Sequence, residues 1–264
     1  MKIGFIGAGK MGNAILSGII NSNFCSSKDI FVAEPNETIA TKLKNSLNIN
    51  IESSQNVVKN SDIIIICTKP FIIKEVLKDI QSSVSPDKVI ISIAAGISTE
   101  TIENILGKIP VIRVMPNTPA LLGVGMSALS RGKFTSNNQL NLALEIFSKV
   151  GKTIVVEENL LDAVTGVSGS GPAFFYLVIE ALAKGGEELG LPKDTALELS
   201  CQTALGAAKM IMETGKTPEI LRKEVTTPGG TTEQGLRVLD ESNVFGTFIE
   251  TVKVTAKKSK ELGA

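Results

Sequence analysis

The stretch Ile3-Gly-Phe-Ile-Gly-Ala-Gly-Lys-Met-Gly12 determines how the first half of this chain folds. Its first four residues predict a short buried strand, and a helical pattern runs from Lys10 to about Ile20. A Gly-x-Gly-x-x-Gly motif between a strand and a helix is typical of a dinucleotide-binding loop. Gly7 permits the tight turn, Gly9 lets a pyrophosphate approach, and Gly12 allows the helix to pack closely on the strand. The alternative is a glycine-rich turn without a ligand.

Strands and helices alternate from this motif to about Glu158. The run Ile63–Cys67 is apolar throughout, as expected of a strand that is buried on both faces. The alternation predicts an α/β Rossmann fold, with a mostly parallel, doubly wound sheet. We expect further strands at Ile30–Ala33, Val89–Ile93 and Val111–Val114, edge strands at Met126–Leu129 and Thr153–Val156, and helices at Ile39–Leu47, Phe71–Ile80, Thr99–Leu106 and Asn137–Val150.

The pattern changes near Asn159, beyond which the sequence predicts helices alone. We divide the chain into a dinucleotide-binding Rossmann domain, residues 1–159, and an all-α dimerisation and substrate-binding domain, residues 160–264. The segment Pro172–Ala183 is apolar almost all round, and such helices are buried. We expect it to pack against a second subunit, although burial within the chain's own bundle is the alternative. The expected helices are Pro172–Leu189, Lys193–Glu213, Pro218–Lys223, Thr231–Asp240 and Val244–Leu262.

Composition excludes several classes of function. The 264 residues include 27 basic and 27 acidic ones, a balance that argues against nucleic acid as the main partner. The absence of histidine excludes a histidine general base or metal ligand. Cys25, Cys67 and Cys201 match no metal or disulfide spacing and favour a reducing compartment. No apolar run reaches the roughly 18 residues that span a bilayer, and a strand at Ile3 leaves no room for a signal peptide, so we expect a cytoplasmic protein without a membrane partner.

Glu34, at the end of the second predicted strand, indicates which dinucleotide the loop prefers. It follows Gly12 by 22 residues, near the position of the acid that binds the ribose 2′-hydroxyl. A carboxylate there repels a 2′-phosphate, and the nearest bases after it are Lys42 and Lys44. These residues favour NADH over NADPH, with a solvated turn glutamate as the alternative.

Three further loops follow predicted strands, namely Thr68-Lys-Pro70, Ala94-Ala-Gly96 and Met115-Pro-Asn-Thr-Pro119. Ligands of open α/β sheets bind outside the carboxyl ends of the strands. We therefore expect Lys69 and Asn117 to line the nicotinamide side, although each loop taken singly is more often a structural turn.

The segment Val225-Thr-Thr-Pro-Gly-Gly-Thr-Thr232 is the most informative part of the helical half. Two glycines let the backbone come close to a ligand, and the free N–H groups of the helix that follows attract an anion. Threonine hydroxyls beside these groups orient a small polar molecule, so we expect a carboxylate site. The alternative is a plain turn in which Thr231 or Thr232 caps the helix.

Taken together, these motifs resemble pyrroline-5-carboxylate reductase. The matching pieces occur in the family's order and span nearly the whole chain, and the last two are the most specific. They are Ile6-Gly-Ala-Gly-Lys-Met-Gly12, Thr68-Lys-Pro70, Ser92-Ile-Ala-Ala-Gly96, Arg113-Val-Met-Pro-Asn-Thr-Pro119, Asp162-Ala-Val-Thr-Gly-Val-Ser-Gly-Ser-Gly-Pro172 and Val225–Thr232. The resemblance implies reduction of 1-pyrroline-5-carboxylate to L-proline with NAD(P)H, the last step of proline biosynthesis. It also implies a homodimer, and in some members decamers built from dimers.

The resemblance assigns residues to two sites. With the motif reasoning above, the dinucleotide site takes in Gly7, Ala8, Gly9, Lys10, Met11, Gly12, Glu34, Asn36, Ser54, Cys67, Thr68, Lys69, Pro70, Ala94, Ala95 and Asn117. By the resemblance, the substrate carboxylate meets Gly230, Thr231 and Thr232, and Glu158 lies beside the ring. Glu34, and Ser54 in place of a frequent asparagine, put NADPH preference in doubt, whereas Thr227 keeps the hydroxyl of the family's usual serine.

An imine substrate suits a protein with these residues. A carbonyl reductase must protonate an alkoxide with an acid such as Lys, Tyr or His, whereas an imine nitrogen is basic enough to be protonated first. Thr232 is the candidate that hydrogen-bonds the ring nitrogen, with Glu158 or water relaying protons. A β-hydroxyacid dehydrogenase is the alternative enzyme, but Phe175 and Ile179 stand where that family has its lysine and asparagine. A dinucleotide-binding sensor without activity is the alternative from another class.

Overall fold

The computed structural model describes residues 1–262, which form two compact units. The first comprises Met1–Ser170 and the residues from Lys253 onward, and the second comprises Gly171–Val252. The chain leaves the first unit later than residue 159 because the following segment packs on the sheet. Leu161 is fully buried there beside Met115. The domain boundary near Asn159 stays a prediction.

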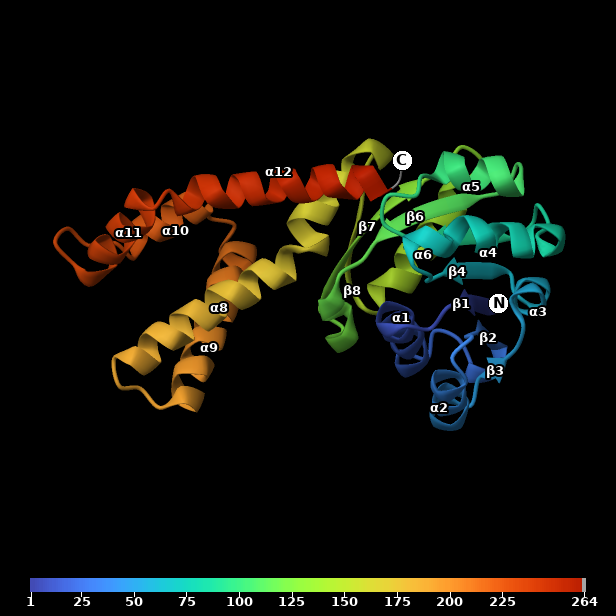
Figure 1. Ribbon diagram of the computed structural model, residues 1–264, viewed down its shortest axis with the longest axis horizontal. Helices are drawn as coiled ribbons and strands as arrows, with labels where there is room; N and C mark the ends of the chain where they lie inside the picture. Colours follow the sequence, from blue (N-terminus) through green and yellow to red (C-terminus); the bar gives the residue numbers. More distant parts are fainter. Residues whose placement is uncertain (263–264) are drawn as a thin grey trace. The chain divides into compact units, whose positions relative to one another are not determined.

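The first unit contains an eight-stranded sheet in the order β3-β2-β1-β4-β5-β6-β7-β8 (Figure 1). β1 to β6 are parallel to one another, β7 is antiparallel to β6, and β8 is parallel to β7. The order of the first six strands is that of a Rossmann sheet, which confirms the predicted fold class. The strands are β1 (Ile3–Ile6), β2 (Ile30–Ala33), β3 (Asn50–Ile51), β4 (Ile63–Ile66), β5 (Val89–Ser92), β6 (Val111–Met115), β7 (Gly125–Arg131) and β8 (Gly151–Val155).

The structure corrects two details of the predicted sheet. The prediction of Met126–Leu129 as an edge strand is wrong, because β7 lies between β6 and β8. β3 and the helix α3 (Ser54–Asn60) have no counterpart in the sequence prediction. Hydrophobic periodicity needs a window of about 11 residues to be informative, and both elements are shorter than that.

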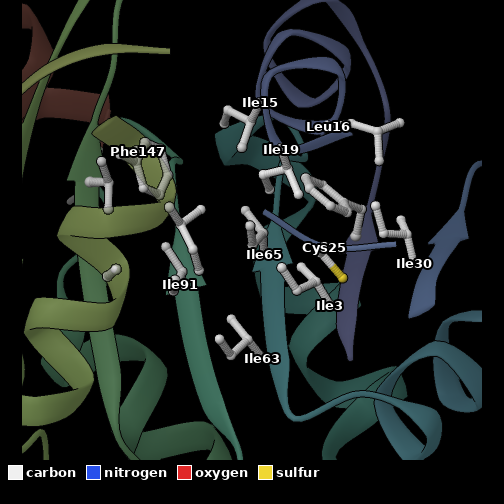
Figure 2. Close-up of a cluster of buried hydrophobic side chains, with 14 of the residues drawn as sticks. Ile3, Ile15, Leu16, Ile19, Cys25, Ile30, Ile63, Ile65, Ile91 and Phe147 are labelled. Atoms are coloured by element: carbon white, nitrogen blue, oxygen red, sulfur yellow. The ribbon is translucent and has the colours of Figure 1, made fainter. Parts of the chain in front are cut away.

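Helices cover both faces of the sheet, since alternate residues of each strand point to opposite faces. On one face Ile3 and Ile65 pack with Ile19 of α1 (Lys10–Asn21), as Figure 2 shows. Ile64, the neighbour of Ile65, belongs to the hydrophobic cluster on the other face. The remaining helices of this unit before residue 170 are α2 (Glu37–Leu47), α4 (Ile73–Ile80), α5 (Thr99–Leu106), α6 (Asn137–Ser148) and α7 (Leu161–Val164).

The second unit is helical throughout the residues that the structure describes. Its helices are α8 (Gly171–Glu188), α9 (Lys193–Thr214), α10 (Pro218–Glu224), α11 (Thr231–Glu241) and α12 (Val244–Leu262), the last of which returns the chain to the first unit. α8 packs along α9.

The apolar surface of α8 stays open in the single chain. Phe175, Tyr176 and Leu177 are 66%, 60% and 64% exposed, so the chain's own helices do not bury this surface. Among the described residues, the stretch Glu158–Glu188 is long and apolar enough to cross a membrane, a test that core helices of soluble proteins also pass. Exposed apolar surface of this kind marks a contact with something outside the chain.

Candidate functional site

The glycine loop joins β1 to α1 in a conformation that depends on its glycines. Gly7 has a φ of +86°, and its N–H donates to the carbonyl of Ala33 at 2.8 Å. A Cβ on Gly12 would lie 2.9 Å from the carbonyl oxygen of Gly7, so α1 comes this close only because residue 12 lacks a side chain. A Cβ on Gly9 would meet nothing within 4 Å, which leaves open space before the loop. The residues present therefore fit the pyrophosphate of a dinucleotide.

A cavity of about 570 Å³ opens beside this loop, where β1, β4, β5 and β6 end. Its wall contains nine of the predicted cofactor residues: Gly9, Lys10, Met11, Cys67, Thr68, Lys69, Pro70, Ala94 and Ala95. Met115, Pro116, Thr118 and Leu121 also line the cavity. The first three belong to the segment Met115–Pro119, which the sequence singles out at the end of β6, but Leu121 carries no such signal.

Another cavity, of about 400 Å³, has Gly7, Glu34 and Ser54 among its lining residues. Thr68 lines both cavities, and its Oγ1 atom is buried without a hydrogen-bond partner among the described residues. Buried polar atoms in native proteins nearly always have a partner. Two cavities that share this wall suit a ligand with two heads joined by a pyrophosphate. The sequence prediction missed Ser53 and Gln55 in the second cavity, because the resemblance singles out only Ser54 between them.

The Glu34 carboxylate is fixed against the glycine loop. Its Oε2 atom accepts a hydrogen bond from the N–H of Ala8 at 2.8 Å, and Oε1 accepts from the N–H of Asn36 at 3.0 Å. The Asn36 side chain caps α2 by accepting from the N–H of Ile39 at 3.1 Å. Glu34 thus holds negative charge at the edge of the loop, where a ribose hydroxyl is able to donate to it.

The amide of Asn117 is used inside the protein. Its Oδ1 atom accepts from the N–H of Met126 at 2.8 Å, and Nδ2 donates to the carbonyl of Ser168 at 3.2 Å. These bonds join the loop after β6 to β7 and to the π-helical turn η6 (Thr165–Gly169). Asn117 therefore anchors the loop whose Pro116 and Thr118 line the cavity, and its contact with the nicotinamide stays a prediction.

Glu158 also has partners within the protein. Its two oxygens accept from the N–H and the hydroxyl of Thr99, each at 2.7 Å. Oε1 lies 3.6 Å from Nη1 of Arg113, a residue that is 4% exposed. The sequence offers a signal for Arg113 that the prediction did not use, namely a charge within the apolar strand Val111–Met115. The expected place of Glu158 beside the substrate ring stays a prediction.

The segment before α11 leaves its backbone donors open. Gly230 is the N-cap and makes no side-chain cap hydrogen bond, so the alternative in which Thr231 or Thr232 caps the helix is wrong. Both threonines stand inside the first turn, one step too late to cap it. The Glu233 carboxylate accepts from the N–H of Gly229 at 2.8 Å and leaves the N–H groups of the first turn accessible. Open N–H groups of this kind attract anions, and the carboxylate site that the sequence predicts here stays a prediction.

Comparison with known proteins extends these findings to the whole chain. Residues 158–262 match the sequence model for the pyrroline-5-carboxylate reductase dimerisation domain, and residues 2–96 match that for the coenzyme F420-dependent NADP oxidoreductases. The chain is 41% identical to the pyrroline-5-carboxylate reductase of Arabidopsis thaliana, over 99% of this chain and 95% of that one. Identity to the enzyme of Methanosarcina acetivorans is 43%, over 99% and 98% of the two chains.

A solved structure shares the arrangement as well as the sequence. The pyrroline carboxylate reductase of Plasmodium falciparum, determined with NADP bound, is 31% identical and gives a TM-score of 0.92. That likeness covers 100% of this chain and 98% of the other. With relatives above 40% identity over almost their full length, the chain belongs to the pyrroline-5-carboxylate reductase family.

Proposed function

We propose that this protein reduces 1-pyrroline-5-carboxylate to L-proline with NAD(P)H. Membership of the reductase family over the whole chain carries the proposal. The fit of the glycine loop to a dinucleotide supports it, because a reductase of this kind needs a bound hydride donor. The open helix start at Gly230 supports it too, because the substrate carries a carboxylate.

Each site has its own task in this reaction. When bound, the nicotinamide supplies the hydride that reduces the imine carbon. The start of α1 holds the pyrophosphate, while Lys69, Pro70 and Ala95 wall the nicotinamide side of the cavity and exclude water. The N–H groups of Thr231 and Thr232 hold the substrate carboxylate, and the Thr232 hydroxyl hydrogen-bonds the ring nitrogen. Orientation is the main contribution, since holding reactants in place removes much of the barrier.

The cofactor preference and the assembly are further parts of the proposal. We propose NADH as the preferred cofactor, supported by the fixed carboxylate of Glu34. We propose a homodimer that covers the exposed face around Phe175 and Leu177, in line with the dimerisation domain that the chain matches. Assembly of dimers into decamers, and a cytoplasmic location without nucleic-acid or membrane partners, complete the proposal by resemblance to the family.

A spectrophotometric assay tests the proposed reaction. We expect oxidation of NAD(P)H that depends on 1-pyrroline-5-carboxylate, with L-proline as the product. A β-hydroxyacid dehydrogenase would instead oxidise hydroxyacids, and a sensor would bind the dinucleotide without turnover. Either result in place of proline formation would refute the proposal.

A pair of threonine variants tests the substrate site. Thr232→Ala should lower kcat/KM for 1-pyrroline-5-carboxylate by about tenfold, the value of one hydrogen bond of about 1.4 kcal/mol. Thr226→Ala is the matched control, because the Thr226 hydroxyl donates to the carbonyl of Arg222 at 2.6 Å and is engaged within the protein. Unchanged turnover in Thr232→Ala would remove the assigned role of this hydroxyl.

A further inference from the structure

A glutamine amide in the wall of the cavity of about 400 Å³ is held in one orientation by a carboxylate. Gln55 of α3 lines this cavity, and its Nε2 atom lies 2.5 Å from Oδ1 of Asp79 in α4. Nε2 also reaches the main-chain carbonyl of Asp79, at 3.5 Å. Carboxylate and carbonyl oxygens only accept hydrogen bonds, so it is the amide nitrogen of Gln55 that faces Asp79. The amide oxygen, Oε1, is therefore turned away from that carboxylate.

The Oε1 atom of Gln55 is left available to a ligand. Within residues 1–262 no group donates a hydrogen bond to it, since both hydrogen bonds of the side chain use Nε2. The side chain is half-buried in the cavity wall, so its conformation is restricted while part of it still faces the open space. A fixed acceptor in such a wall selects a ligand that presents a donor to it.

The other polar side chains of the wall discriminate less well between donors and acceptors. The hydroxyls of the serines and of Thr68 rotate, and a hydroxyl either donates or accepts. Glu52 is a second acceptor in the wall, but one of its oxygens already accepts from the side-chain amide of Asn60 at 2.9 Å. Gln55 is therefore the first candidate for reading the polar edge of a ligand.

The remaining surface of the cavity fits the flat face of a nucleobase. Pro35, Ile72 and Val76 contribute apolar walls, and Val76 stands one turn before Asp79 in α4. The same helix thus supplies an apolar wall and the carboxylate that holds the amide. Glu34, which we expect to bind the ribose, lines this cavity too, so the base attached to that ribose belongs here.

We propose that Gln55, held by Asp79, selects adenine as the base of the dinucleotide, with Oε1 accepting a hydrogen bond from the 6-amino group. The proposal rests on the proposed function, in which the ligand is NAD(P)H. Hypoxanthine and guanine carry a carbonyl oxygen at this position, so two acceptors would face each other without a proton between them. A site built to bond a substrate N–H rejects an analogue that lacks it. Gln55 determines the specificity for the base, and Asp79 is its positioning residue.

The selection of the base is separable from the rest of the reaction. Gln55, Asp79 and every other residue of this cavity belong to the first unit, whereas Thr231 and Thr232 belong to the second. NADH and NADPH carry the same base, so the preference that Glu34 sets between them is a different property. The test is therefore a binding measurement that needs no pyrroline substrate.

Isothermal titration calorimetry of the full-length protein compares NADH with reduced nicotinamide hypoxanthine dinucleotide. We expect the parent to bind NADH about tenfold more tightly. Gln55→Met keeps the length of the side chain but removes both polar atoms, so the preference should fall to about twofold or less. Gln81→Met is the matched control, because Nε2 of Gln81 likewise donates to an oxygen, the carbonyl of Ile105 at 2.6 Å, but Gln81 lines neither cofactor cavity. It should keep the preference of the parent.

Asp79→Lys tests the orientation of the amide without altering the residue that meets the base. A lysine only donates hydrogen bonds, so it is unable to hold Nε2 of Gln55 and favours the reversed amide. The preference for adenine should disappear or invert. Because the two dinucleotides carry the same charge, the ratio of their Kd values is insensitive to the added charge of the lysine.

The outcomes distinguish this proposal from the proposed function. Equal affinities in the parent, a tenfold preference that survives Gln55→Met or Asp79→Lys, or an equal loss in Gln81→Met would overturn it. A preference that Glu52→Gln removes would assign the base to Glu52 and overturn it as well. A parent that selects adenine but does not reduce 1-pyrroline-5-carboxylate would refute the proposed function and leave the selection of the base standing.

Discussion

Glu34→Gln separates the charge of this side chain from its shape. In the parent, the carboxylate accepts from the N–H groups of Ala8 and Asn36 at 2.8 and 3.0 Å. Glutamine has the same length and keeps one acceptor oxygen, but it carries no charge. If the carboxylate repels a 2′-phosphate, the variant should use NADPH better than the parent does, with little gain for NADH.

Coulomb's law sets the size of the effect. A 2′-phosphate of about −2 charge placed about 5 Å from the carboxylate is repelled by about 1.7 kcal/mol in a dielectric of about 80. At about 1.4 kcal/mol per factor of ten, this corresponds to about 17-fold. Salt at about 0.15 M screens over about 8 Å and reduces the repulsion to about 0.9 kcal/mol, or about fourfold. The preference for NADH should therefore weaken as ionic strength rises.

The assay is kcat/KM for NADH and NADPH at low and physiological salt. We expect the parent to favour NADH, and Glu34→Gln to move the ratio towards NADPH by about fourfold at physiological salt and more at low salt. Glu34→Ser should narrow the gap as well. Glu37→Gln, which removes an exposed charge in the first turn of α2, is the control and should shift the ratio less. Equal use of both cofactors by the parent, or a ratio that Glu34→Gln leaves unchanged, would refute the reasoning.

Three further predictions concern the loop, the buried charge and a thiol. Gly9→Ala should fold normally, since its Cβ meets only open space in the protein, but this Cβ should weaken binding of the dinucleotide that approaches there. Gly12→Ala should weaken binding and also lower the melting temperature, because its Cβ meets the Gly7 carbonyl oxygen. Thermal melts and cofactor titrations distinguish the two variants. Arg113→Met should destabilise the protein by about 3 kcal/mol in urea unfolding, because its carboxylate partners lose their cation, and a loss below about 1 kcal/mol would contradict this. Burial raises the pKa of the Cys67 thiol, so it stays protonated at about pH 8 and should be alkylated far more slowly than the exposed Cys201, as mass spectrometry would show. Similar rates for the two thiols would count against that assignment.

Local patterns in the sequence were sufficient for the Rossmann sheet and its loop. The run Ile63–Ile66 is recognisable as a buried strand from its own residues. The spacing of Gly7, Gly9 and Gly12 likewise reflects a local feature, a tight turn followed by the start of a helix. Elements too short to show a periodic pattern, such as β3, were not predicted, because they carry no local signal of that kind. The position of β7 inside the sheet also escaped it, since strand order depends on pairing between distant segments.

Only the tertiary structure decided what the polar side chains at the ends of the strands do. The sequence predicts that Asn117 and Glu158 lie beside the ligands, which stays a prediction, and it gives no sign of their partners within the protein, Ser168 and Thr99, which are 51 and 59 positions away. Those partners are fixed by how the chain returns to the sheet, and no local spacing encodes that path. The sequence by itself therefore determined the fold class and the family, because these follow from local periodicity and motifs. The tertiary structure decided which polar groups meet, as the Ser259 hydroxyl meets the Asp162 carboxylate across 97 positions.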